Sequence, residues 1–397
     1  MPKTVLIALD EFGYGGRQRY TFNLIQGLVA RGIRVVFATG GGAMLSRLPQ
    51  EVRVEIVDFA RGGEKQDIAE EHILFAAQEE GVELIHAQTK TSLLCSARAS
   101  EELGIPLVDH EHHHYVAAAY PQVVAQLRAY ADLVLTLGPK AREKLVDAGL
   151  EPARVATVFH GVSLTDFPRT SNEERKRARE NLGLREEDAV AIAVSRMVLG
   201  KGMIALTESF IEVAQRVPRA KLLLVGDDPN GHVKDFVERL VARNKLSDRV
   251  CIYPGTFDTK TYLAAADVFC HPMLAKGLSV MEAMATGLPV IGNNTPHKPF
   301  VVEDGVTGFL MEPLSGAKKI DRKALSEKLT YALSHLEELH EMGERAHEKI
   351  AEEFSFEKHL EAVLALYEKI IAEKAQGRSL PKIPAPLVED DRYLREA

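Results

Sequence analysis

The stretch TVLIALDEFGYGGRQRYTFNLIQGLVARGIRVVFAT, residues 4–39, indicates the fold class. It begins with a short apolar run, passes through a glycine-rich loop and a segment of helical period, and ends in a second apolar run. The helical segment places Leu24, Ile25 and Leu28 on one side and stops at Gly32, a common C-terminal signal. Two buried strands joined by a helix form a βαβ unit, which belongs to a parallel sheet.

The same alternation continues along the chain of 397 residues, a length that favours two domains. Apolar runs predict further strands at 52–57, 82–87, 105–110, 132–137 and 154–159, and a second series at 189–195, 220–226, 249–254, 267–272 and 288–292. The prediction is an α/β protein with two Rossmann-like parallel-sheet domains. We expect them at 1–165 and 166–355, followed by a helix at 356–376 and an extended, proline-containing tail at 377–397.

Two other segments have no predicted function. Residues 161–170 read as a hinge between the domains, and the charged segment 171–183 reads as a solvated helix face. The C-terminal stretch 321–339 has a helical period and is predicted as one helix.

Composition and charge exclude several classes of protein. The net charge of -8 gives no general attraction to nucleic acid or to an anionic membrane. The three cysteines are scattered and lack CxxC spacing, so we expect a cytoplasmic protein without a disulfide framework. The first apolar run is too short for a signal peptide or a membrane span. We therefore expect no transmembrane segment, while peripheral membrane contact stays an open alternative.

Ligands of open parallel sheets bind beyond the C-terminal ends of the strands, so the loops there are candidate sites. In the first loop, Gly15 and Gly16 allow a ligand to approach the backbone, and Arg17 opens the following helix. The glycines lack the GxGxxG spacing of a dinucleotide site. A tight turn without any ligand explains this loop equally well.

A second candidate loop, VSRMVLGKGM at 194–203, carries Arg196 and Lys201 around a turn that Gly200 and Gly202 permit. Two cations placed in this way can converge on one diphosphate and stabilise a departing phosphate. The alternative is a pair of solvated surface cations.

In the third candidate stretch, 275–292, Gly277, Leu278 and Ser279 precede a short helix whose amides and positive dipole end suit a phosphate. Glu282 would then accept hydroxyl groups of a ribose. Ser279 and Glu282 also match the S-x-x-E pattern of a capping box, which needs no ligand. The residues alone leave both interpretations open.

The fourth stretch, DHEHHHY at 109–115, is the densest histidine cluster. If the preceding strand continues, His110, His112 and His114 share one face, which raises the alternative of a metal site. No second ligand cluster with recognisable spacing appears in the sequence. We therefore favour a histidine presented to a substrate, and no metal.

Taken in order, seven segments resemble retaining glycosyltransferases of the GT-B fold, in the large nucleotide-sugar-dependent family four (glycosyl transferases group 1). The segments are GYGGRQRYTFNLIQGLVARG (13–32), FHGVSLTDF (159–167), SRMVLGKG (195–202), LLLVGDDP (222–229), AAADVFCHP (264–272), EAMATGLPVI (282–291) and VVEDGVTGFL (301–310). The resemblance extends over nearly the whole chain.

The resemblance implies a role for each candidate residue. Arg196 and Lys201 would neutralise the donor diphosphate, Glu282 would bind the ribose, and the amides of the Gly277, Leu278 and Ser279 region would hold phosphate. Counted from Pro106, the family's active-site histidine falls on His112, which would contact the transferred sugar. Gly15, Gly16 and Arg17 would line the acceptor side, and the helix at 356–376 would return to the first domain.

The chain departs from the family pattern beside the donor site. Where the family usually carries a glutamate that contacts hydroxyl groups of the donor sugar, eight positions before Glu282, this chain has Leu274. Lys276 stands before Gly277. This departure leaves the donor sugar unassigned.

The resulting prediction is a metal-independent retaining hexosyltransferase. It would transfer a sugar from a UDP- or GDP-type nucleotide sugar to an unidentified acceptor, with no cofactor beyond that donor and no nucleic-acid partner. The alternatives are a sugar-nucleotide epimerase of the same fold, a non-catalytic nucleotide-sugar-binding protein, and a metallohydrolase built on the histidine cluster.

Overall fold

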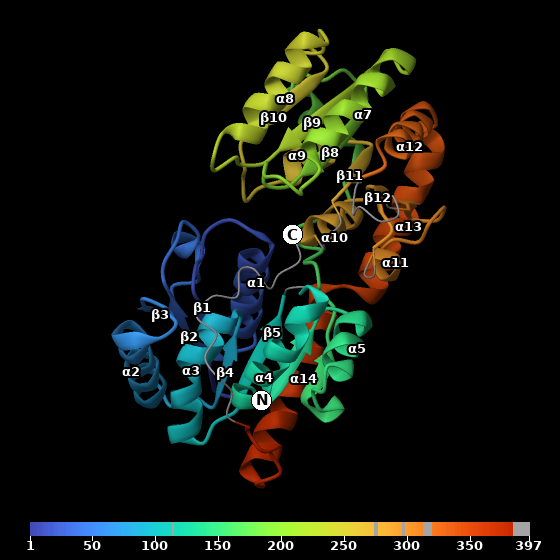
Figure 1. Cartoon of the computed structure of the whole chain (residues 1–397). Coiled ribbons are helices and arrows are strands. Elements are labelled where there is room, and N and C mark those ends of the chain that lie inside the picture. Colours follow the sequence, from blue (N-terminus) through green and yellow to red (C-terminus); the bar gives the residue numbers. More distant parts are fainter. Residues whose placement is uncertain (113–114, 274–276, 296–297, 313–319, 384–397) are drawn as a thin grey trace. The chain divides into compact units, whose positions relative to one another are not determined.

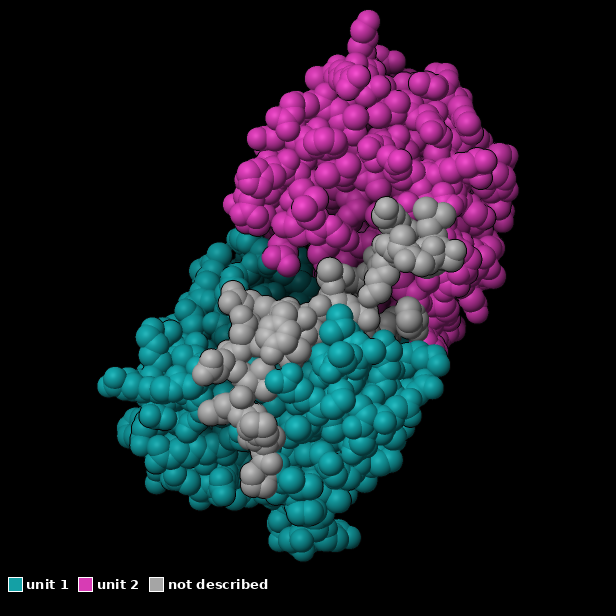
Figure 2. Space-filling model, viewed as in Figure 1, with its two compact units in different colours: residues 1–161, 357–397 teal, residues 162–356 magenta. Residues whose placement is uncertain are grey.

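The computed structural model describes residues 1–112, 115–273, 277–295, 298–312 and 320–383 (Figure 1). The chain divides into two compact units, coloured separately in Figure 2. Unit 1 comprises Met1–Gly161 and Glu357–Ala397, and unit 2 comprises Val162–Phe356.

Unit 1 is built on a seven-stranded sheet with the order β3-β2-β1-β4-β5-β6-β7, in which every pairing is parallel. All its predicted strands are present. They are β1 (Thr4–Leu9), β2 (Arg34–Thr39), β3 (Arg53–Ile56), β4 (Leu84–Ala87), β5 (Leu107–Glu111), β6 (Leu133–Thr136) and β7 (Val155–Thr157). Every residue of β1 is buried, because both faces of the sheet are covered.

Helices cover this sheet. They are α1 (Gly16–Ala30), α2 (Gly63–Glu79), α3 (Lys90–Leu103), α4 (Tyr120–Tyr130), α5 (Pro139–Asp147) and, from the C-terminal end of the chain, α14 (Phe356–Ala375). Short 3-10 turns lie at Leu45–Arg47, Ala117–Ala119 and Pro152–Arg154. Among the described residues, no helix has the length and apolar character needed to cross a membrane.

Unit 2 is built on a six-stranded sheet with the order β10-β9-β8-β11-β12-β13, again with parallel pairings. Its strands are β8 (Ala189–Val194), β9 (Ala220–Val225), β10 (Val250–Tyr253), β11 (Val268–His271), β12 (Val290–Asn293) and β13 (Gly308–Met311). The last strand is absent from the sequence prediction, because GFLM is short and begins with glycine.

The helices of unit 2 correct two sequence expectations. They are α6 (Asn172–Asn181), α7 (Met203–Arg216), α8 (His232–Arg243), α9 (Lys260–Ala265), α10 (Leu278–Ala285), α11 (Lys298–Val301), α12 (Arg322–Ser334) and α13 (Leu336–Glu353). The stretch 321–339 does not form one helix, because the chain leaves helical geometry at His335. Nor is α6 only a solvated face: Arg179 is 2% exposed and pairs with the buried Asp267 at 2.9 Å.

Both sheets reverse their strand order at a central point. The reversal lies between β1 and β4 in unit 1 and between β8 and β11 in unit 2. Loops that leave such neighbouring strands diverge to opposite sides and open a ligand site at the C-terminal edge of the sheet. The candidate residues of both units follow these strands or their neighbours.

Candidate functional site

In unit 2, the loop between β8 and α7 carries Arg196 and Lys201. Gly200 and Gly202 adopt φ values of +86° and +80°, which turn the chain back toward α7. Arg196 is exposed and Lys201 is half-buried. Burial lowers the pKa of Lys201, and the nearby charge of Arg196 lowers it further. The two side chains therefore repel each other, and an anion held between them would relieve this repulsion.

The neighbouring strand fixes the start of this loop. A Cβ atom on Gly226 would lie 1.9 Å from the carbonyl oxygen of Ser195, so only glycine permits the two backbones to approach in this way. The amide of Met197 donates to the carbonyl oxygen of Asp227 at 2.8 Å. The backbone on both sides of Arg196 is thus held in place by the end of β9.

The second element at this edge of the sheet is α10, which follows β11 across the reversal point. Gly277 is its N-cap, in an extended conformation without a side-chain cap, so Ser279 lies inside the first turn. The capping-box interpretation of Ser279 and Glu282 is therefore wrong. Ser279 instead donates to the carbonyl oxygen of Val194 at 3.4 Å, which links the start of α10 to the end of β8. Glu282 lies in the same helix and is 6% exposed.

The structure adds two buried basic side chains that sequence reasoning missed, His271 and Lys298. His271 ends β11, and a Cβ atom on Gly277 would lie 2.4 Å from its Nε2. The Lys298 amine, on α11, donates to the carbonyl oxygens of His271 at 3.1 Å and Met273 at 3.0 Å. Burial lowers the pKa of Lys298 to about 7. It also takes the pKa of His271 well below its usual value, with further lowering by Lys298 and Lys201.

The end of β11 therefore lies close to Lys201, to Lys298 and to Gly277, the N-cap of α10. Lys201 at this point can bind a phosphate group, whereas the buried Lys298 amine is engaged by two backbone carbonyls and holds the end of β11 in place. The residues Leu274 and Lys276, where the chain departs from the family pattern, lie outside the described residues, as do His113 and His114.

In unit 1, the glycine-rich loop leads from β1 into α1. Gly15 is the N-cap of α1 in an extended conformation and has no side-chain cap, so the first turn keeps amides directed out of the helix. Gly15 and Gly16 are exposed and Arg17 is half-buried. The loop thus has the geometry of an anion- or hydroxyl-binding turn.

His112 directly follows β5 and is held from the end of the neighbouring strand β4. Its Nε2 lies 2.9 Å from Oε1 of Gln88. Its ring stacks on His110, with centroids 4.3 Å apart and planes inclined by 13°. His160, from the segment after β7, joins these two, and the three side chains form a possible ligand group. The spacing of histidines in the sequence gives no sign of His160 as a member.

A buried ion cluster lies on the same strand as these histidines. The Lys90 amine lies 2.5 Å from Asp109 and 2.9 Å from Glu111, and all three side chains are almost fully buried. Burial raises the pKa of Asp109 to about 6, against the opposing effect of Lys90. Because Asp109 and Glu111 alternate with His110 along β5, the cluster anchors the strand from its opposite face.

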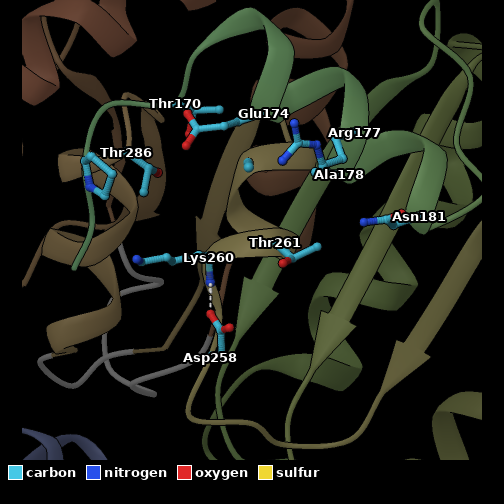
Figure 3. A pocket seen from close by; sticks show the side chains of 11 residues that line it. Thr170, Glu174, Arg177, Ala178, Asn181, Asp258, Lys260, Thr261 and Thr286 are labelled. Carbon is cyan, nitrogen blue, oxygen red and sulfur yellow. Dashed lines mark hydrogen bonds between the residues drawn. The ribbon is translucent and has the colours of Figure 1, made fainter. Parts of the chain in front are cut away.

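Figure 3 shows a separate pocket of about 220 Å³ in unit 2, between α6 and α9. Its polar lining includes Arg177, Lys260 and Asp258. Neither the loop after β8 nor the start of α10 contributes to it. The candidate residues in the loop after β8 and at the start of α10 therefore lie outside this pocket.

Comparison with known proteins gives the class and the family. Residues 174–349 match the family of glycosyl transferases group 1, and residues 14–166 match glycosyltransferase family 4. The structure of Anabaena HepE in complex with UDP-glucose superposes with a TM-score of 0.80 at 20% identity, covering 92% of this chain and 99% of that one. A glycosyltransferase of Rickettsia africae gives a TM-score of 0.81 at 18% identity, over 93% and 98% of the two chains.

Curated relatives align over shorter stretches. An alpha-monoglucosyldiacylglycerol synthase of Streptococcus pneumoniae is 28% identical over 306 residues, 68% of this chain and 67% of that protein. A trehalose synthase of Pyrococcus horikoshii is 30% identical over 198 residues, 47% of this chain and 45% of that protein, so the match spans less than half of that relative.

Two parallel-sheet α/β units with these structural neighbours define the GT-B fold, and the matching family models define the class, a glycosyltransferase. Within that class, the chain belongs to the glycosyl transferases group 1. The fold class, the family and the enzyme class predicted from the sequence are confirmed.

Proposed function

We propose that the protein is a retaining, metal-independent hexosyltransferase that takes its sugar from a UDP- or GDP-type nucleotide sugar in the cytoplasm. The observation that supports this most directly is the pairing of Arg196 and Lys201 in the loop after β8, with the open N-terminus of α10 across the reversal point of the same sheet. Fixed positive charge at this edge can take the role that a metal ion has in other transferases.

In this proposal each unit has its own task. In unit 2, Arg196 and Lys201 bind the diphosphate and stabilise its negative charge as the bond to the sugar breaks. The amides of Leu278 and Ser279 bind phosphate oxygens, and Glu282 accepts hydroxyl groups of the ribose. In unit 1, His112 contacts the transferred sugar. Gly15, Gly16 and Arg17 contribute to acceptor binding.

Release of nucleoside diphosphate tests the proposal. HepE binds UDP-glucose in its crystal structure, so UDP-glucose is the first donor to try, followed by other UDP- and GDP-sugars with lipid, glycan and small-molecule acceptors. We expect release that depends on an acceptor, persists in EDTA and yields a product with the anomeric configuration of the donor. If none of the donors in this panel releases nucleoside diphosphate, the result would contradict the proposal. Conversion of the donor without an acceptor would favour an epimerase.

The first mutational prediction concerns the two cations. Arg196→Ala and Lys201→Ala should each lower turnover by about 100-fold or more, because each removes one preorganised charge from the departing diphosphate. Steady-state kinetics with the active donor measure the effect. Lys260→Ala, in the pocket of Figure 3, is the matched control and should leave turnover unchanged. Unchanged rates in both loop variants would remove Arg196 and Lys201 from the site.

A further inference from the structure

Three imidazole side chains converge in unit 1 from two distant segments. His110 lies in β5, His112 follows β5, and His160 follows β7. One ring nitrogen from each lies within 4.8 Å of the others. In a tetrahedral zinc site with Zn–N bonds of about 2.0–2.1 Å, ligand nitrogens lie roughly 3.3 Å apart. Because the rings of His110 and His112 are stacked with planes inclined by 13°, binding of one ion requires them to rotate out of the stack until both nitrogens point toward it.

Neighbouring groups hold each part of this cluster in place. Gln88 contacts Nε2 of His112 through its amide oxygen and so orients this ring. Tyr20 stacks on His160, with centroids 4.4 Å apart and planes inclined by 17°. The imidazole of His359 contacts the carbonyl oxygen of Phe159 at 2.7 Å and so fixes the backbone beside His160. Such outer contacts orient the ligands of metal sites.

Two of the three rings are accessible from the surface. His110 is 1% exposed, whereas His112 and His160 are half-buried and reach the surface. An ion could enter beside the two half-buried rings and keep an open coordination position for water or a ligand.

The nature of the ligands selects the class of ion. Imidazole nitrogen suits zinc, copper, nickel and cobalt, whereas magnesium and calcium prefer oxygen ligands. We propose that His110, His112 and His160 form a binding site for a divalent transition-metal ion, with Zn²⁺ as the representative ion. This site goes beyond the metal-independent transfer proposed above and requires no metal for that reaction.

The site has a consequence that does rest on the proposed function. If His112 contacts the transferred sugar, an ion bound to His112 competes with that contact. Zn²⁺ should therefore inhibit transfer, and a chelator should restore it. Binding and inhibition are separate measurements, so the failure of the transferase proposal would leave the binding test intact.

Binding is tested on the full chain by titration calorimetry with Zn²⁺, with the visible spectrum of Co²⁺ as a second measurement. We expect one Zn²⁺ per chain and no comparable binding of Mg²⁺. His160→Gln and His112→Gln should each raise the dissociation constant at least about 10-fold, because each removes a ligand. Thermal unfolding and circular dichroism show whether each variant is folded. His112→Gln and His160→Gln alter half-buried side chains, so at least one folded variant is expected.

Two controls make the assignment specific. His72→Gln changes a histidine that is 44% exposed and lies 3.6 Å from Glu55, and should leave Zn²⁺ binding unchanged. The double variant His113→Gln/His114→Gln changes the next two histidines of the sequence and should also retain binding. Absence of Zn²⁺ binding in the unaltered protein would overturn the proposal. Binding that survives loss of both His112 and His160, or that is lost in the His113/His114 variant, would overturn it as well.

Discussion

At the scale of single residues, Lys298 stands out because a lysine amine is buried with two backbone carbonyls as its hydrogen-bond acceptors. One acceptor belongs to His271, the last residue of β11. The other belongs to Met273, two residues further along the chain toward α10. Asn293, at the end of β12, donates to the carbonyl oxygen of Pro272 in the same segment. The side chains of Lys298 and Asn293 therefore hold the backbone of residues 271–273, before α10, and Lys298 is a positioning residue.

The burial of the Lys298 amine predicts how the free energy of unfolding changes with pH. The pKa of Lys298 is about 7 in the folded protein, against about 10.4 for lysine in an unfolded chain. Between these values the unfolded state binds more protons, so the contribution of Lys298 to the free energy of unfolding rises with pH, by at most about 1.4 kcal/mol per pH unit. In Lys298→Met this rise should disappear between pH 7 and pH 10.

Denaturant unfolding of both proteins at several pH values in this range measures the difference. Lys323→Met, at a side chain that is 85% exposed, is the control and should follow the unaltered protein. A constant difference in stability between Lys298→Met and the unaltered protein at every pH would contradict the lowered pKa of Lys298.

At the scale of elements, the strands could be predicted and the contacts between elements could not. Apolar runs located β1 to β12 because a strand in a covered parallel sheet is apolar on both faces. The four-residue β13 lacked that signal. Ser279 and Glu282 have the spacing of a capping box, but Gly277 caps α10, and only the structure shows where the helix begins. His160 is remote in sequence from His112, so folding alone brings the two together.

The contact between Gly277 and β11 yields a prediction for α10. In Gly277→Ala, the new methyl group would lie 2.4 Å from Nε2 of His271, whose ring is buried. The start of α10 must then move away from the end of β11. Overpacking of this kind costs about 1–3 kcal/mol, so we expect the dissociation constant for the active nucleoside diphosphate to rise about 10-fold or more.

Calorimetry with that nucleotide measures the change. The double variant Gly277→Ala/His271→Ala removes the ring that the methyl group meets, and it should bind more tightly than Gly277→Ala alone if the clash is the cause. An equal affinity of Gly277→Ala and the unaltered protein would show that the start of α10 does not bind the nucleotide.

At the scale of the whole molecule, the two units differ in how the chain builds them. Unit 2 is one continuous segment, whereas unit 1 combines the N-terminal part of the chain with α14 and the residues after it. Tyr367 of α14 is fully buried, and its hydroxyl lies 2.5 Å from Nδ1 of His86 in β4. Lys374 of the same helix pairs with Asp132 at 2.8 Å. Completion of unit 1 therefore requires the C-terminal end of the chain, after unit 2 has been synthesised.

This connectivity predicts that the two units respond differently to loss of α14. Truncation after Ser355 removes Tyr367 and Lys374 and leaves the buried His86 and Asp132 without these partners. Loss of the partners of such buried groups costs several kcal/mol, a large part of the free energy of unfolding of a marginally stable unit. Hydrogen exchange followed by mass spectrometry should show residues 1–161 losing protection while residues 162–355 keep it. Unit 2 is thus the internal control. Equal loss of protection in both units would mean that they unfold as one cooperative body, and retained protection in residues 1–161 would mean that unit 1 folds without α14.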